Sequence, residues 1–132
     1  MSNTPDDRLY SKDHEWAQVE GDLVRVGLTD HAQRQLGDVV FVELPAVGDR
    51  YEAGEPFGSV ESVKAVSEVY VPVTGAVVEV NAALTDSPEL VNEDPYGDGW
   101  AIRLRADGPP STDGLLDAEG YAKYVTAESD AD

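Results

Sequence analysis

Lys64 is the residue of this chain best placed to do chemistry. It is one of only three lysines in 132 residues, in a sequence with 27 acidic and 9 basic side chains. Small and β-branched residues flank it on both sides, and the turn-forming residues Gly58 and Gly75 lie further out. This pattern predicts a lysine displayed at the tip of a β-hairpin, between strands at about 55–62 and 65–72. A solvated amine there is a good attachment point for a cofactor arm, although most lysines in turns are ordinary surface charges.

No other residue type forms a recognisable catalytic or metal-binding motif. The sequence has no cysteine, which rules out disulfides, thiolate metal sites and a cysteine nucleophile. His14 and His31 are the only histidines, and their spacing is not that of a metal-binding pair. We expect His14 to be a structural hydrogen-bonding residue, and His31 to pack or cap in the first turn of a helix. The sequence also lacks a phosphate-binding glycine loop and a serine nucleophile elbow.

Acidic residues dominate the charge of the chain, which has a formal net charge of −18. Neither nucleic acid nor an anionic membrane is expected as a partner, because binding to phosphate needs clustered lysine and arginine. The acids are spread along the whole sequence, so we expect an adaptation to a high-salt, halophilic host. No apolar run is long enough to span a membrane, and the first residues lack the features of a secretory signal. A cytoplasmic protein is therefore expected.

Short segments with period-two alternation predict a mainly β protein. A short helix is expected with Asp30 as its N-cap and Gly37 as its end, and a helical turn is expected over 86–90. Many short strands separated by glycine and proline indicate a β-sandwich or barrel. Besides the two strands around Lys64, strands are expected at 15–19, 23–28, 39–44, 75–80 and 100–104.

The C-terminal part of the sequence predicts one longer helix. Asp117 is its expected cap, and helical spacing places Ala118, Tyr121, Ala122 and Val125 on one face. We expect a single domain over 1–127, followed by an acidic tail at 128–132 that is frayed.

The chain resembles the H protein of the glycine cleavage system from about Tyr10 to Val125. The resemblance rests on five segments in the family's order and spacing: DHEW at 13–16, GLTDHAQ at 27–33, LGDVVFVELP at 36–45, GSVESVKA at 58–65 and NEDPYGDGW at 92–100. It implies a lipoyl-carrier fold, a barrel-sandwich hybrid of two small sheets with short helices and a C-terminal helix. It also implies that lipoate is covalently attached to Lys64.

The resemblance further implies a shuttle with no catalysis of its own. The attached arm would accept the aminomethyl group of glycine at the glycine decarboxylase (P protein) and deliver it to the aminomethyltransferase (T protein). Dihydrolipoamide dehydrogenase (L protein) would then reoxidise the arm. A lipoate-attaching enzyme is the remaining expected partner, and the carrier is expected to be a monomer.

In this family the loaded arm folds into a cleft on the carrier's own surface. The positions that match the cleft contacts are Asp13, Glu15, Gln35 and Glu68, and acids among them would hold the ammonium of the arm. The family commonly has serine where Asp13 stands, some members have histidine where Gln35 stands, and aspartate is also used at the position of Glu68. Glu61 and Glu68 flank the hairpin tip and are candidates for recognition by a lipoylating enzyme. In so acidic a chain, each of these carboxylates is equally consistent with an ordinary surface charge.

Four other functions fit parts of the sequence. A lipoyl domain of a 2-oxoacid dehydrogenase normally belongs to a longer chain with a Pro/Ala-rich linker, which is absent here. A biotin carrier usually has methionines beside its lysine, where this chain has Val63 and Ala65. A lipoyl relay, which donates lipoyl groups to other enzymes, needs the same displayed lysine and stays open. So does an unmodified β-sandwich that acts only as an interaction module.

Overall fold

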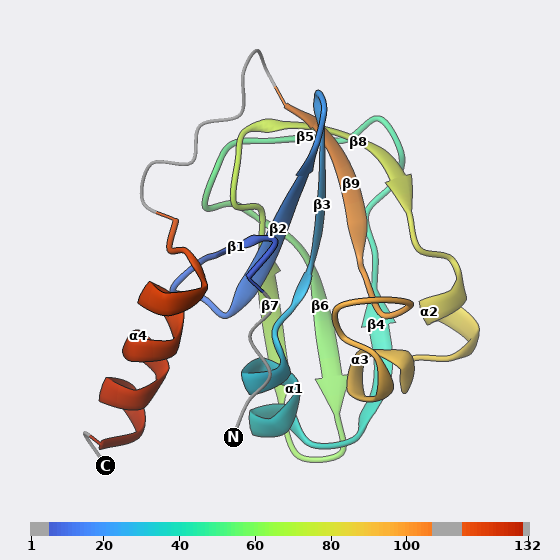
Figure 1. The fold of residues 1–132 in the computed structure, drawn as a ribbon. Coiled ribbons are helices and arrows are strands. Elements are labelled where there is room, and N and C mark those ends of the chain that lie inside the picture. Colours follow the sequence, from blue (N-terminus) through green and yellow to red (C-terminus); the bar gives the residue numbers. More distant parts are fainter. Residues whose placement is uncertain (1–5, 107–114, 131–132) are drawn as a thin grey trace.

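Two antiparallel β-sheets form the body of the molecule in the computed structural model, which describes residues 6–106 and 115–130 (Figure 1). The larger sheet has the strand order β1-β2-β3-β9-β8-β5, and the smaller sheet has the order β4-β6-β7. This architecture confirms the predicted mainly β class. The strands are β1 (Leu9–Tyr10), β2 (Glu15–Glu20), β3 (Leu23–Leu28), β4 (Val39–Glu43), β5 (Arg50–Tyr51), β6 (Pro56–Ser62), β7 (Val66–Tyr70), β8 (Gly75–Val80) and β9 (Ile102–Ala106).

Four helices accompany the sheets in the described residues: α1 (Asp30–Leu36), α2 (Ala83–Asp86), α3 (Leu90–Glu93) and α4 (Ala118–Asp130). Helices α1 and α3 lie at the end of the smaller sheet where β6 turns into β7, whereas α4 packs beside β1 (Figure 1). Among the described residues, none of these helices has the length and apolar character needed to cross a membrane.

The core draws its side chains from both sheets. Val24 and Val26 of β3 are completely buried, as are Ile102 and Leu104 of β9, as expected for strands that alternate between an inner and an outer face. Trp16 of β2 is also completely buried, and it packs over Gly27 on the paired strand. A Cβ atom at Gly27 would lie 2.7 Å from the indole ring, so only glycine fits opposite this tryptophan.

The C-terminal helix is fixed by a second aromatic cluster. Tyr121 stacks on Tyr10 with ring centroids 4.7 Å apart, and both side chains are buried. The Asp117 carboxylate accepts a hydrogen bond from the Gly120 amide at 2.8 Å, which confirms the predicted cap. Of the residues predicted on one face of this helix, Tyr121 is buried and Ala118 and Val125 are partly buried, whereas Ala122 is exposed.

The structure corrects several predicted boundaries. The cap of α1 is Thr29, whose hydroxyl accepts a hydrogen bond from the Ala32 amide; Asp30 is already the first helical residue. Two short helices, α2 and α3, flank residues 87–89 in place of one helical turn over 86–90. Strand β9 begins at Ile102, later than predicted. Helix α4 runs to Asp130 and so includes most of the expected acidic tail, while residues 131–132 lie outside the described part.

Candidate functional site

Lys64 lies at the tip of the β6–β7 hairpin, as the sequence predicted. Glu61 pairs with Val66 at the end of the ladder, and the exposed Lys64 is in the turn beyond it. Ser62 closes this turn: its buried hydroxyl accepts hydrogen bonds from the amides of Lys64 at 3.3 Å and Ala65 at 3.1 Å. The Ser62 amide donates to the Ala65 carbonyl at 2.8 Å. The lysine therefore projects from a turn whose backbone is fixed.

Asn92 of α3 supports the tip from the side. Its amide group donates to the Gly37 carbonyl at 2.8 Å and to Gln33 Oε1 at 3.0 Å, and its carbonyl oxygen accepts from the Val39 amide at 2.8 Å. These bonds fix the segment between α1 and β4. That segment in turn holds the hairpin, because the Asp38 carbonyl accepts a hydrogen bond from the Val63 amide at 3.1 Å.

The sequence did not single out Ser62 or Asn92 as functional residues. A serine two residues before the displayed lysine is a local signal for a side-chain-closed turn, and it could have been used. Asn92 is 55 residues from Gly37 in the chain, and no periodic pattern connects positions so far apart.

The Lys64 side chain lies over the end of α1. A Cβ atom at Gly37 would come within 3.4 Å of Lys64 Cε, and the backbone of Gly37 has a positive φ of 80°. The positive φ favours glycine at this position. Lys64 is exposed, and among the described residues no acidic group forms an ion pair with its amine.

Glu15 is the second unusual residue near the hairpin, because its carboxyl group is buried. Only 1% of the residue is exposed, and burial raises its pKa to about 8. Its Oε1 accepts a hydrogen bond from the Ser11 hydroxyl at 3.0 Å, and its Oε2 accepts one from the Tyr70 amide at 2.7 Å. Glu15 thereby joins β2 of the larger sheet to β7 of the smaller sheet. Of the two interpretations left open by the sequence, that of an ordinary surface charge is wrong for Glu15.

The other predicted pocket residues are exposed. Glu68 lies on β7 on the same face as Tyr70, whose amide binds Glu15. Asp13 is close enough that its charge, in addition to burial, raises the pKa of Glu15. The structure thus places Asp13 near Glu15, and Glu68 two residues along β7 from the Tyr70 amide that Glu15 binds. Gln35 lies on α1, two residues before Gly37, and no hydrogen bond among the described residues joins it to the three acids.

Both histidines contribute to packing. His14 Nδ1 lies 2.8 Å from the Tyr121 hydroxyl, and that hydroxyl lies 2.8 Å from Thr29 Oγ1. His31 is buried against His14, with ring centroids 4.6 Å apart. The roles predicted for His14 and His31 are confirmed. No cluster of three or more potential metal ligands occurs in the part of the chain that the structure describes.

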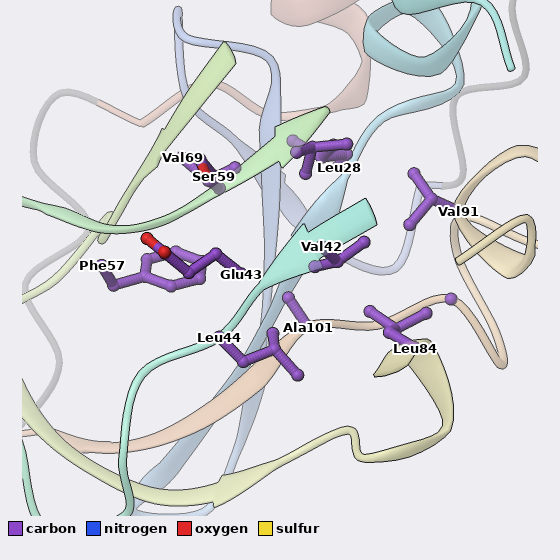
Figure 2. A pocket seen from close by; sticks show the side chains of 12 residues that line it. Leu28, Val42, Glu43, Leu44, Phe57, Ser59, Val69, Leu84, Val91 and Ala101 are labelled. Atoms are coloured by element: carbon purple, nitrogen blue, oxygen red, sulfur yellow. The ribbon is translucent and has the colours of Figure 1, made fainter. Parts of the chain in front are cut away.

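Behind the smaller sheet lies a narrow apolar cleft (Figure 2). The cavity volume available to water is about 10 Å³, which is about the minimum for one bound water. The cleft therefore has no room for a cofactor arm in this arrangement of side chains. Its lining residues are mostly aliphatic, with Glu43 and Ser59 as polar members: Leu28, Val42, Glu43, Leu44, Phe57, Ser59, Val60, Val69, Leu84, Val91, Gly99 and Ala101.

Comparison with known proteins identifies the family. The glycine cleavage H-protein family matches residues 8–128 of this chain. The chain belongs to this family. It is 57% identical over 129 residues to the glycine cleavage system H protein of Herpetosiphon aurantiacus, with 98% of each chain covered. It is also 57% identical over 128 residues to that of Rubrobacter xylanophilus, covering 97% of this chain and 99% of the relative.

A solved structure supports the same family. The crystal structure of a glycine cleavage system H protein from Mycobacterium marinum superposes with a TM-score of 0.80 at 43% identity, covering 95% of this chain and 98% of that one. The two-sheet architecture is accordingly the lipoyl-carrier barrel-sandwich fold. As a member of this family, the chain is a lipoyl-bearing shuttle of the glycine cleavage system and is a carrier subunit, not a catalyst. Its partners are the P, T and L proteins of that system.

Proposed function

We propose that Lys64 bears the lipoyl group, and that on this arm the protein carries the aminomethyl group of glycine from the P protein to the T protein. The observation that carries this proposal is the exposed amine at the tip of a hairpin whose turn is closed by Ser62. A lipoyl-lysine arm extends on the order of 10–15 Å in extended covalent geometry, so it can enter an enzyme while the carrier stays outside. When attached, its dithiolane supplies the disulfide that accepts the aminomethyl group and the dithiol that the L protein reoxidises.

Attachment needs an activated lipoate. The Lys64 ammonium first loses a proton, and the free amine attacks the acyl carbon of lipoyl-adenylate. The new amide bond replaces the acyl–phosphate bond, AMP leaves, and a second proton is released to the enzyme or solvent. The proposal includes a cytoplasmic location, where the ATP that this activation consumes is available. Its charge of −18 opposes self-association, which supports a monomer.

The proposal also includes a resting place for the loaded arm beside β7. The exposed carboxylates of Asp13 and Glu68 would accept hydrogen bonds from the ammonium of the arm, with the exposed Gln35 of α1 as a neutral acceptor. Glu15 is buried, and a nearby ammonium would favour its ionised form. Its high pKa otherwise disfavours that form.

The lifetime of the aminomethylated carrier tests this resting place. Glu68→Ala should shorten that lifetime, whereas Glu52→Ala, at another exposed acid, should not. An unchanged lifetime in Glu68→Ala would remove Glu68 from the pocket, and Asp13→Ala tests the second acid in the same way.

Intact and peptide mass spectrometry tests the attachment itself. The protein is incubated with lipoate, ATP and a lipoate–protein ligase, beside the Lys64→Arg variant. We expect one lipoyl group on the peptide that contains Lys64 and none on the variant. If the ligase is active on a control carrier but leaves this protein unmodified, the proposal is wrong.

A further inference from the structure

Exposed apolar side chains gather around Lys64. Six large hydrophobic residues are exposed in the described part of the chain, and four of them belong to the hairpin tip or to the strand beside it. We call these four the tip patch: Val40 (49% exposed), Phe41 (52%), Val63 (71%) and Val66 (67%). The other two, Val19 and Val47, lie on β2 and in the loop after β4. Apolar groups that cluster on a surface mark a contact site more often than scattered ones do.

The strand register places Phe41 and Val66 of the tip patch on one face of the smaller sheet. Phe41 of β4 pairs directly with Glu61 of β6, and Glu61 pairs directly with Val66 of β7. Residues that pair directly across strands share a face of the sheet, so these three side chains form an exposed row. Val40 lies at the irregularity in β4, and Val63 is in the tip itself. The start of β4 and the hairpin tip lie at the same end of the smaller sheet (Figure 1).

Acidic side chains surround the tip patch. The exposed acids are Glu61 within the row, Glu43 and Glu68 in the next row of the sheet, and Asp38 beside Val63. Strands β4, β6 and β7 contain no lysine or arginine. A complementary surface would be apolar at its centre and edged by lysine and arginine. A second copy of this chain does not fit, because equal acids would face one another across the contact.

We propose that the tip patch and its acids are the docking surface for the enzyme that attaches lipoate to Lys64. This inference rests on the proposed function. A lysine side chain reaches only about 6 Å from its Cα atom. The attaching enzyme must therefore bring its acyl donor against the hairpin tip, and the rim of its active site must cover the residues around Lys64. The occupant is an enzyme whose lysine-entry site has an apolar rim edged by basic residues.

Steady-state lipoylation kinetics with matched double variants test this surface. Val63→Thr/Val66→Thr replaces two exposed valines of the tip patch, and Val19→Thr/Val47→Thr makes the same change at the two exposed valines elsewhere. Threonine keeps the β-branched shape, so both variants should fold. Initial rates are measured with a purified lipoate–protein ligase, lipoate and ATP over a range of carrier concentrations. We expect KM to rise about tenfold in the tip variant with kcat little changed, and neither value to change in the control.

Two further variants test the aromatic and the acidic parts of the surface. Phe41→Thr should raise KM by a similar factor. Glu61→Gln should raise KM more than Glu52→Gln does, because Glu52 is an exposed acid outside the smaller sheet. Thermal melts of every variant establish that the carrier is folded under the assay conditions.

The outcomes separate the two proposals. An unchanged KM in the tip variant and in Phe41→Thr, with normal lipoylation of the unaltered protein, would overturn the docking surface alone. An equal rise of KM in the control double variant would overturn it too, because KM would then depend on the polarity of the whole surface and not on the tip patch. No lipoylation of the unaltered protein by an active ligase would refute the proposed function and this inference with it.

Discussion

Glu15 holds the two sheets together with a carboxyl group that is almost completely removed from water. Burial disfavours the charged form of a carboxyl group, and it raises the pKa of Glu15 to about 8. The two hydrogen bonds that Glu15 accepts lower the pKa, but their effect is smaller than that of burial. In the unfolded chain the same carboxyl has its ordinary pKa of 4.5. The folded protein therefore binds a proton at this residue that the unfolded chain releases, over the pH range between these two values.

This difference makes the stability of the protein depend on pH. Because the folded pKa is the higher one, the stabilising contribution of Glu15 is complete below its unfolded pKa and is lost as the pH rises towards about 8. Glu15→Gln keeps a neutral acceptor for the Tyr70 amide and has no proton to lose. We expect the free energy of unfolding of the unaltered protein to fall, relative to that of Glu15→Gln, between about pH 5 and pH 8.

Urea unfolding of both proteins across this range measures the effect. The difference between the two free energies should change by up to a few kcal/mol, with the variant gaining as the pH rises. Parallel curves over the whole range would show that Glu15 has the same pKa in both states, contrary to this account.

At the scale of elements, the lysine hairpin depends on a support that is distant in the sequence. Helix α3 presents Asn92, and Asn92 binds the backbone on both sides of Asp38, whose carbonyl holds the Val63 amide. The position of the attachment lysine is thus set by contacts between α1, α3 and the hairpin, in addition to the ladder of β6 and β7.

Asn92→Ala should loosen this end of the molecule. The substitution leaves the Val39 amide and the Gly37 carbonyl without their partner, and a loss of about 2–3 kcal/mol in the free energy of unfolding is expected. Native-state hydrogen exchange at the Val63 amide should also become faster, because the carbonyl that it binds is no longer held in place.

A matched control exists at Asn81. Its side chain also makes hydrogen bonds to backbone groups, those of Asp98, Trp100 and Ala83, and none of these belongs to the hairpin or to the segment between α1 and β4. Asn81→Ala should therefore reduce global stability without a selective effect on the Val63 amide. If both variants change exchange at Val63 equally, Asn92 has no special role in positioning the tip.

Much of the fold followed from the sequence because its signals are local. The alternation of residues 23–28 and the small residues around Lys64 predicted β3 and the hairpin, and the five matching segments supplied the fold family. The burial of Glu15 was not predictable in this way. It depends on the approach of β7 to β2, which brings the Tyr70 amide to a residue 55 positions away in the chain.

Short elements were missed for a related reason. Strands β1 and β5 have only two residues each, too few for a periodic pattern, and they exist because β2 and β8 offer an edge to pair with. The cap of α1 was placed one residue late, at Asp30, because aspartate and threonine are both good caps and the choice depends on backbone conformation. The tip patch escaped notice because exposure is a property of the assembled sheet.

At the scale of the whole molecule, charge is the dominant feature. The excess of 27 acidic over 9 basic residues gives a net charge of −18, and the described ion pairs neutralise only part of the acids. Such a chain repels itself when it is compact, and salt screens this repulsion.

We expect a high-salt host, and the stability of the protein should reflect it. The melting temperature should rise between low and multimolar potassium chloride, because the Debye length falls from about 10 Å at 0.1 M to about 3 Å at 1 M. Thermal melts at a series of salt concentrations measure this. A melting temperature that is indifferent to salt would argue against the halophilic adaptation, while leaving the carrier function untouched.

The most direct test of the central claim is to load the carrier from glycine. Lipoylated protein is incubated with glycine and a purified P protein that is active on a known H protein, and the peptide containing Lys64 is analysed by mass spectrometry. We predict a mass increase of one aminomethyl group on the lipoyl-Lys64 peptide, and none for Lys64→Arg or without glycine. A fully lipoylated protein that an active P protein fails to load would contradict its assignment as the aminomethyl carrier.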